Sequence, residues 1–166
     1  MCRVLLLVFL GCMILSCSKR VRKDLSEGEY VIEHYKNDSI KNGRSTSYFK
    51  NGKKQRIIKY RNNIMVGEMK YYHDNGKIAS KTHFKDGKVK DKFYNFHKNG
   101  NPYNTYIYAE NKLMGVENCF DGNGKLLNCG TLKAGTGFIN QYNIEGKIIA
   151  IDYIQDGRYI KTDSIK

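Results

Sequence analysis

The sequence predicts an all-β protein, an elongated single-layer antiparallel β-meander of about twelve strands. Two observations carry this prediction. Glycine is frequent and proline is nearly absent, with 16 Gly and one Pro in 166 residues. Glycine allows frequent turns, and strands without proline can donate every backbone N–H to a ladder. Turn signals also recur at a regular spacing, and the segments between them are rich in Tyr, Phe, Ile and Thr, which is typical of β-strands.

The recurring turns define a repeat of 24 residues. Its first turn is centred on a glycine, which recurs as Gly52, Gly76, Gly100, Gly124 and Gly146. A second turn follows in each unit, at 62–63, 86–87, 110–111, 134–135 and 156–157. Asn-Gly and Asp-Gly pairs supply the positive φ that tight hairpin turns need. Each unit is therefore predicted to be a two-stranded hairpin, with a leading strand near 30–36 and a last strand near 158–162.

Aromatic and aliphatic residues form two rows, one before each set of turns. The first row is Tyr48, Tyr72, Phe96, Phe120 and Tyr142. The second row is Tyr60, Phe84, Tyr108, Leu132 and Ile154. Because side chains at equivalent strand positions line up across a sheet, we expect the rows to form the apolar spine of the protein. An aromatic platform for a ligand is the alternative.

One unit carries the repeat most clearly, at residues 67–77, where the sequence reads GEMKYYHDNGK. This pattern resembles the MORN family, and more closely its bacterial MORN-variant form. The resemblance covers about residues 29–161 and implies an elongated, twisted sheet of hairpins. Many bacterial members are classed as YwqK-type antitoxins. The resemblance therefore implies an alternative function, in which the protein neutralises a partner toxin.

The N-terminus reads as a bacterial lipoprotein signal peptide over residues 1–16. Arg3 supplies the positive charge, and residues 4–15 form an apolar run that is too short to span a bilayer comfortably. The run ends at Ser16-Cys17, which resembles a lipobox, and Cys17 is the predicted lipid attachment site. The alternatives are Cys12 as the anchor, an ordinary cleaved signal, or an uncleaved anchor. Residues 17–28 are then a lipidated tether, and residues 29–166 the repeat domain.

This predicted location limits the partners that the protein can bind. A lipid on Cys17 would hold the protein at a membrane of the bacterial cell envelope, on the periplasmic or the surface side. The chain carries a formal charge of +13, which favours an anionic envelope polymer or surface as partner. Lysines that keep the broad faces of a thin sheet soluble are the alternative explanation. Secretion separates the chain from nucleic acid, so no nucleic-acid partner is expected.

Cys119 and Cys129 are the two cysteines that follow the tether, and they flank the turn at Gly124. With a three-residue loop they are diagonal neighbours, and with a loop two residues longer they lie directly opposite each other. An oxidising compartment would permit a disulfide between them. Two free, half-buried thiols are the alternative.

The sequence contains no constellation typical of an enzyme. The four histidines (His34, His73, His83 and His97) lack metal-binding spacing, and we expect them to be surface or packing residues. No nucleophile motif and no phosphate-binding loop is present, so no catalytic residue, metal or cofactor is predicted. We expect a non-enzymatic scaffold that binds a protein or an anionic envelope surface through residues that the sequence does not identify.

Overall fold

The protein is described here from a computed structural model, in which residues 18–165 are described. Within this range it is built of antiparallel strands and one short 3₁₀ turn, Ser26–Gly28. The strands are β1 (Ser18–Asp24), β2 (Tyr30–Lys36), β3 (Ile40–Lys41), β4 (Gly43–Tyr48), β5 (Lys54–Arg61), β6 (Ile64–Tyr72), β7 (Ile78–Lys85), β8 (Lys88–Phe96), β9 (Pro102–Ala109), β10 (Lys112–Glu117), β11 (Gly137–Tyr142), β12 (Ile148–Gln155) and β13 (Arg158–Ser164). No helix in this range is long and apolar enough to cross a membrane.

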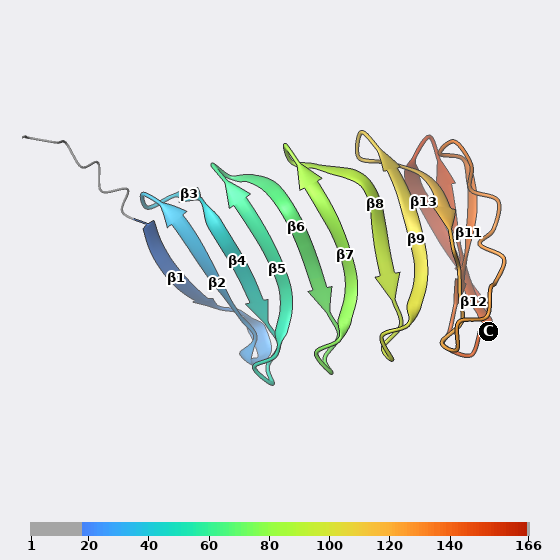
Figure 1. Ribbon diagram of the computed structural model, residues 1–166, viewed down its shortest axis with the longest axis horizontal. Helices are drawn as coiled ribbons and strands as arrows, with labels where there is room; N and C mark the ends of the chain where they lie inside the picture. The colour runs from blue at the N-terminus through green and yellow to red at the C-terminus, as the bar shows by residue number, and fades with distance from the viewer. Residues whose placement is uncertain (1–17, 166) are drawn as a thin grey trace, which may run out of the picture.

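The strands of the large sheet, apart from β3, follow one another across the molecule in chain order, and the small sheet lies at the β9 end (Figure 1). A ten-stranded sheet runs from β1 to β10, with the two-residue β3 paired beside β2, and β11 to β13 form a separate three-stranded sheet. The all-β antiparallel meander is thus confirmed. The predicted leading strand is β2, and the predicted last strand is β13.

Both sets of predicted turns occur, because their residues hold the backbone in the left-handed region. The five glycines of the first set of turns, four of them preceded by Asn, have φ between +76° and +92°. In the second set of turns both central residues have positive φ, even where they are not glycine, as at Glu110 (47°) and Ala134 (49°). Consecutive positive φ values give the hairpin turn whose twist matches that of the strands. The repeat is therefore set by turn chemistry.

The Asn-Gly turns also bind one another along the sheet. The amides of Asn51, Asn75 and Asn99 donate to the backbone carbonyls of Asp74, Lys98 and Gly122 in the following turn, at 3.3, 2.7 and 2.7 Å. His73 and His97 make the same kind of link through Nε2, to the carbonyl oxygens of Phe96 (3.0 Å) and Phe120 (2.8 Å). These two histidines therefore join neighbouring repeats, as expected of packing residues.

The main core lies on one face of the large sheet, which we call the inner face. Ile58, Met69 and Phe84 are buried there, on β5, β6 and β7. Only Phe84 of these three belongs to a predicted row. Small side chains such as Ser45 and Thr82 stand opposite the large ones, at Ile58 and Met69. The opposite, outer face carries no buried apolar cluster within residues 18–165.

The chain departs from a regular single layer at its C-terminal end. Residues 118–136 form isolated bridges in place of the hairpin that the repeat predicts. Leu132, Ile139 and Ile154 pack with Tyr106 and Val116, so the small sheet covers the inner face of β9 and β10. The molecule is therefore two layers thick here, and this second layer gives the last repeats a conventional core.

Part of the segment predicted to be a tether is an ordered strand of the sheet. Residues 18–24 form strand β1, which pairs with β2 over its whole length, from Ser18 opposite Lys36 to Asp24 opposite Tyr30. This basic segment is therefore an edge strand of the sheet, which the tether prediction did not include. Three of its residues lie on the inner face, where Lys23, Val21 and Lys19 stand opposite Val31, Glu33 and Tyr35. The predicted signal peptide, residues 1–16, and the predicted anchor Cys17 lie outside the described residues.

Candidate binding face and disulfide junction

Four basic side chains meet in directly opposed pairs on the outer face. Arg44 on β4 is the register partner of Lys59 on β5, and Lys70 on β6 is the partner of Lys81 on β7. Ile57, two residues before Lys59, is opposite Lys70, so both pairs lie on the same face. Like charges directly opposite each other destabilise a sheet. Two such pairs on neighbouring hairpins therefore need a compensating interaction.

Two shallow depressions, which together we call the basic groove, lie along these pairs. One, of about 310 Å³, is lined by Arg44, Ile57, Lys59, Glu68, Lys70 and Tyr72. The other, of about 650 Å³, is lined by Glu68, Lys81, Thr82, His83, Lys90, Asp91, Lys92 and Tyr94. They adjoin at Glu68, which lines both. The lining contains six Lys or Arg residues and two acids, so the groove is strongly cationic.

The acids of this region neutralise only part of the charge. Glu68 pairs with Lys70 at 2.7 Å, and this hydrogen bond raises the pKa of the lysine. Glu117 pairs with Lys92 at 2.5 Å with the same effect on its pKa. Within residues 18–165, the other groove cations form no salt bridge.

An aromatic side chain stands beside the cations of the groove. The ammonium of Lys81 lies 5.5 Å from the ring centre of Tyr94, its register partner on β8. Tyr94 is itself exposed. A flat apolar ring among cations suits a ligand that is anionic and has some apolar surface.

A buried carboxylate holds the N-terminal end of the inner face together. Glu33 on β2 is bonded to Lys41 at 2.5 Å, to Lys23 at 3.1 Å and to the hydroxyl of Tyr35 at 2.5 Å. Burial acts to raise the pKa of Glu33, but these three hydrogen bonds outweigh it and lower the pKa to about 2. Because its partners come from β1, β2 and β3, this carboxylate ties the first strands of the sheet to one another.

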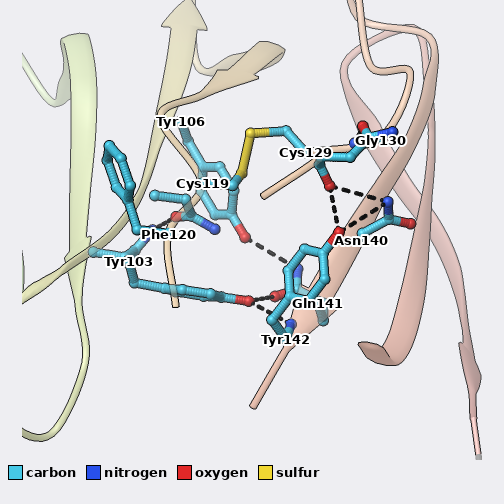
Figure 2. The surroundings of a disulfide bond; sticks show 12 residues. Tyr103, Tyr106, Cys119, Phe120, Cys129, Gly130, Asn140, Gln141 and Tyr142 are labelled. Carbon is cyan, nitrogen blue, oxygen red and sulfur yellow. Dashed lines mark hydrogen bonds between the residues drawn. A yellow bond between two sulfur atoms is a disulfide. The ribbon is translucent and has the colours of Figure 1, made fainter. Parts of the chain in front are cut away.

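Cys119 and Cys129 are joined by a disulfide, with their Cα atoms 5.4 Å apart (Figure 2). The pair closes a loop that contains the Gly124 turn, and the Cys119 side chain is fully buried. The bond therefore closes residues 119–129 of the irregular segment into a loop, at the point where the two sheets meet.

Hydrogen bonds beside the disulfide connect the sheets, and Figure 2 shows them converging on Gln141. The hydroxyl of Tyr103 on β9 donates to the side-chain oxygen of Gln141 at 2.8 Å and accepts from the backbone N–H of Tyr142 at 2.9 Å. The Gln141 amide also reaches the hydroxyl of Tyr106 at 3.2 Å. Burial raises the pKa of Tyr103 to about 12, against the lowering effect of the Tyr142 N–H. Tyr103 therefore remains a neutral donor at ordinary pH.

The backbones approach closely at this junction, and glycine permits it. A Cβ on Gly130 would lie 2.3 Å from the carbonyl oxygen of Phe138, and one on Gly122 would lie 2.3 Å from a side-chain carbon of Ile144. Neither glycine falls on a repeat position. Glycines outside the repeat were therefore the sequence signal for this contact, and the sequence reasoning did not use it.

The basic groove was not identified from the sequence either. Lysines recur in every repeat. The face of the sheet on which each one lies depends on strand register and on bulges, such as the one between Ile57 and Lys59. A single shift of register moves a side chain to the other face. The number of lysines therefore indicated a basic surface, but the sequence could not show which lysines lie on the same face of the sheet.

These features define a β-hairpin repeat protein with one apolar face and one cationic face. In a comparison with known families, residues 41–62 and 65–86 match the family model described as MORN repeat variant. The matched segments span β4 to β7 and contain both opposed basic pairs. No curated protein matches the chain.

Proposed function

We propose that this protein is a non-enzymatic scaffold, held at a bacterial envelope membrane by a lipid on Cys17, that binds an anionic envelope surface with its basic groove. The observation that carries the proposal is the pair of directly opposed basic contacts, Arg44 with Lys59 and Lys70 with Lys81. Lysines that only solubilise a sheet would be more stable staggered than opposed.

An extended anionic partner suits this geometry better than a small ligand. The groove crosses β4 to β8 and is shallow, so one small molecule would remain largely exposed in it. A surface or polymer that carries repeated phosphates or carboxylates can contact several strands at once. Each basic residue near such a surface contributes about 1 kcal/mol.

The predicted anchor supports the same partner. Ser18, the residue after Cys17, begins β1, whose side chains include Lys19, Arg20, Arg22 and Lys23. A lipid on Cys17 would bring this basic edge of the sheet against the headgroups, where anionic lipids attract it. Strand β1 would then lie against the membrane surface.

The anchor is tested by labelling cells that express the full chain with radioactive palmitate. We expect label on the wild type, loss of label in Cys17→Ala, and accumulation of the uncleaved form with the signal peptidase inhibitor globomycin. Label retained in Cys17→Ala would contradict the assignment, and a parallel Cys12→Ala variant shows whether the alternative cysteine is used.

The groove is tested by sedimentation with vesicles of phosphatidylcholine, with and without phosphatidylglycerol, and with purified lipopolysaccharide. A variant with Arg44, Lys59, Lys70 and Lys81 changed to Gln should bind at least ten-fold more weakly, since about 1 kcal/mol is lost per charge. A control in which Lys50, Lys112, Lys125 and Lys147 become Gln loses the same charge outside the groove. Equal weakening in both variants would show that only total charge matters.

A protein partner is distinguished by crosslinking in intact cells followed by mass spectrometry. One stoichiometric protein, bound equally by the wild type and the groove variant, would contradict the proposal and favour the antitoxin-type alternative.

A further inference from the structure

Strand β13 is an open edge of the small sheet. Within residues 18–165 it pairs with β12 on one side only, and every residue from Arg158 to Ser164 is exposed. Tyr159 is 60% and Ile160 55% exposed, which is unusual for large apolar side chains at a sheet edge. Such an edge is a template for another strand.

The pairing with β12 fixes which backbone groups face outward. The N–H of Ile165 donates to the carbonyl of Ile149 at 2.8 Å, so these two residues form a hydrogen-bonded pair. Hydrogen-bonded pairs alternate along an antiparallel ladder. The backbone groups of Thr162 and Ser164 therefore point away from β12, toward the open side.

We propose that β13 pairs antiparallel with β13 of a second copy of this chain, with Thr162 opposite Thr162. In this register Lys161 of each copy lies opposite Asp163 of the other, and both contacts form by symmetry. Opposite charges directly across two strands stabilise the pair. The two small sheets then join into one six-stranded sheet, and the two-fold axis closes the assembly at two copies.

The neighbouring registers are disfavoured by charge. A shift that sets Thr162 opposite Ser164 places Asp163 opposite Asp163, and the reverse shift places Lys161 opposite Lys161. At the other end of the molecule, β1 carries Lys19, Arg20, Arg22 and Lys23, so two β1 edges repel each other. The charges therefore select the self-pairing of β13 around Thr162.

A cysteine placed on the symmetry axis tests the register directly. In the full chain in intact cells, Thr162→Cys should form a disulfide-linked dimer under mild oxidation, since hydrogen-bonded partners have Cα atoms about 5.5 Å apart. Ser164→Cys is the matched control, because its copies would be about 13 Å apart, four residues out of register. We expect at least ten-fold more dimer for Thr162→Cys than for this control, and wild type gives the background from the native cysteines. Equal crosslinking in the two variants, or none in Thr162→Cys, would overturn the proposal.

Two further sets of variants separate pairing from folding. Thr162→Pro removes an outward N–H that β12 does not use, and proline is tolerated at such edge positions. It should abolish in-cell dimer crosslinking by an amine-reactive reagent, whereas Thr162→Val, which keeps the N–H, should retain it. Lys161→Asp and Asp163→Lys should each reduce the dimer at least five-fold, and the double exchange should restore it. Failure of the double exchange to restore the dimer counts against the register.

Discussion

Reduction of the Cys119–Cys129 disulfide should destabilise the C-terminal end of the protein and leave the N-terminal repeats unchanged. The bond spans a sequence separation of 10 residues. In the chain-entropy description, a closed loop of this length lowers the entropy of the unfolded chain, and this raises the free energy of unfolding by about 3 kcal/mol. For a domain of this size, that corresponds to a fall of roughly 10 °C in the melting temperature of the unit that contains the bond.

The effect should be local because repeats are stabilised mainly by their neighbours. Hydrogen exchange with mass spectrometry on oxidised and reduced protein should show faster exchange in residues 103–155, where Tyr103, Gln141 and Tyr142 link the two sheets. Peptides from β4 to β7 should exchange at the same rate in both. A Cys119→Ala/Cys129→Ala variant controls for effects of the reductant. Unchanged exchange in residues 103–155 after complete reduction, or equal acceleration everywhere, would refute this reasoning.

Three further outcomes follow from single side chains. The lowered pKa of Glu33, about 2, gives stability that is present above its usual pKa and is lost as pH falls toward 2, so chemical denaturation from pH 6 to 2 should show a smaller decline in Glu33→Gln, by up to about 3 kcal/mol. Ala134→Gly should raise the free energy of unfolding by about 1 kcal/mol, since Ala134 is held at a φ of +49°; a loss of stability in urea titrations would contradict this. Tyr103→Phe should cost about 1 kcal/mol in the same titrations, because the partly buried N–H of Tyr142 loses its acceptor; no change would mean that water replaces the hydroxyl.

The repeat was predictable because its turns are chemically distinctive. A pair of residues with positive φ is rare outside glycine and asparagine, so their recurrence every 24 residues located the hairpins in advance. The period also located Glu110 and Ala134 in turns, although neither residue favours this conformation. Position in the repeat therefore predicted more than residue type did.

The faces of the sheet were not predictable in the same way. Bulges occur in most strand pairs, as between Tyr71 and Tyr72 and between Asn95 and Phe96, and they break the simple alternation of side chains. Four of the five residues of the first row stand at such bulges, namely Tyr48, Tyr72, Phe96 and Tyr142. The buried core at Ile58 and Met69 depends on register, which a hydrophobic pattern with frequent lysines does not fix.

A sheet that is one layer thick over most of its length divides stability and binding between its two faces. The inner face holds Ile58, Met69 and Phe84, whereas the outer face holds the opposed cations. If those cations are present for binding, then removing one should favour the fold while weakening the interaction. Lys59→Gln, which relieves the contact with Arg44, should raise the free energy of unfolding by about 0.2–1 kcal/mol and reduce sedimentation with anionic vesicles. Lys125→Gln, at a turn outside the groove, should change neither. A Lys59→Gln variant that is less stable than the wild type would show that the lysine serves the fold, and would contradict the proposal that the opposed cations are present for binding.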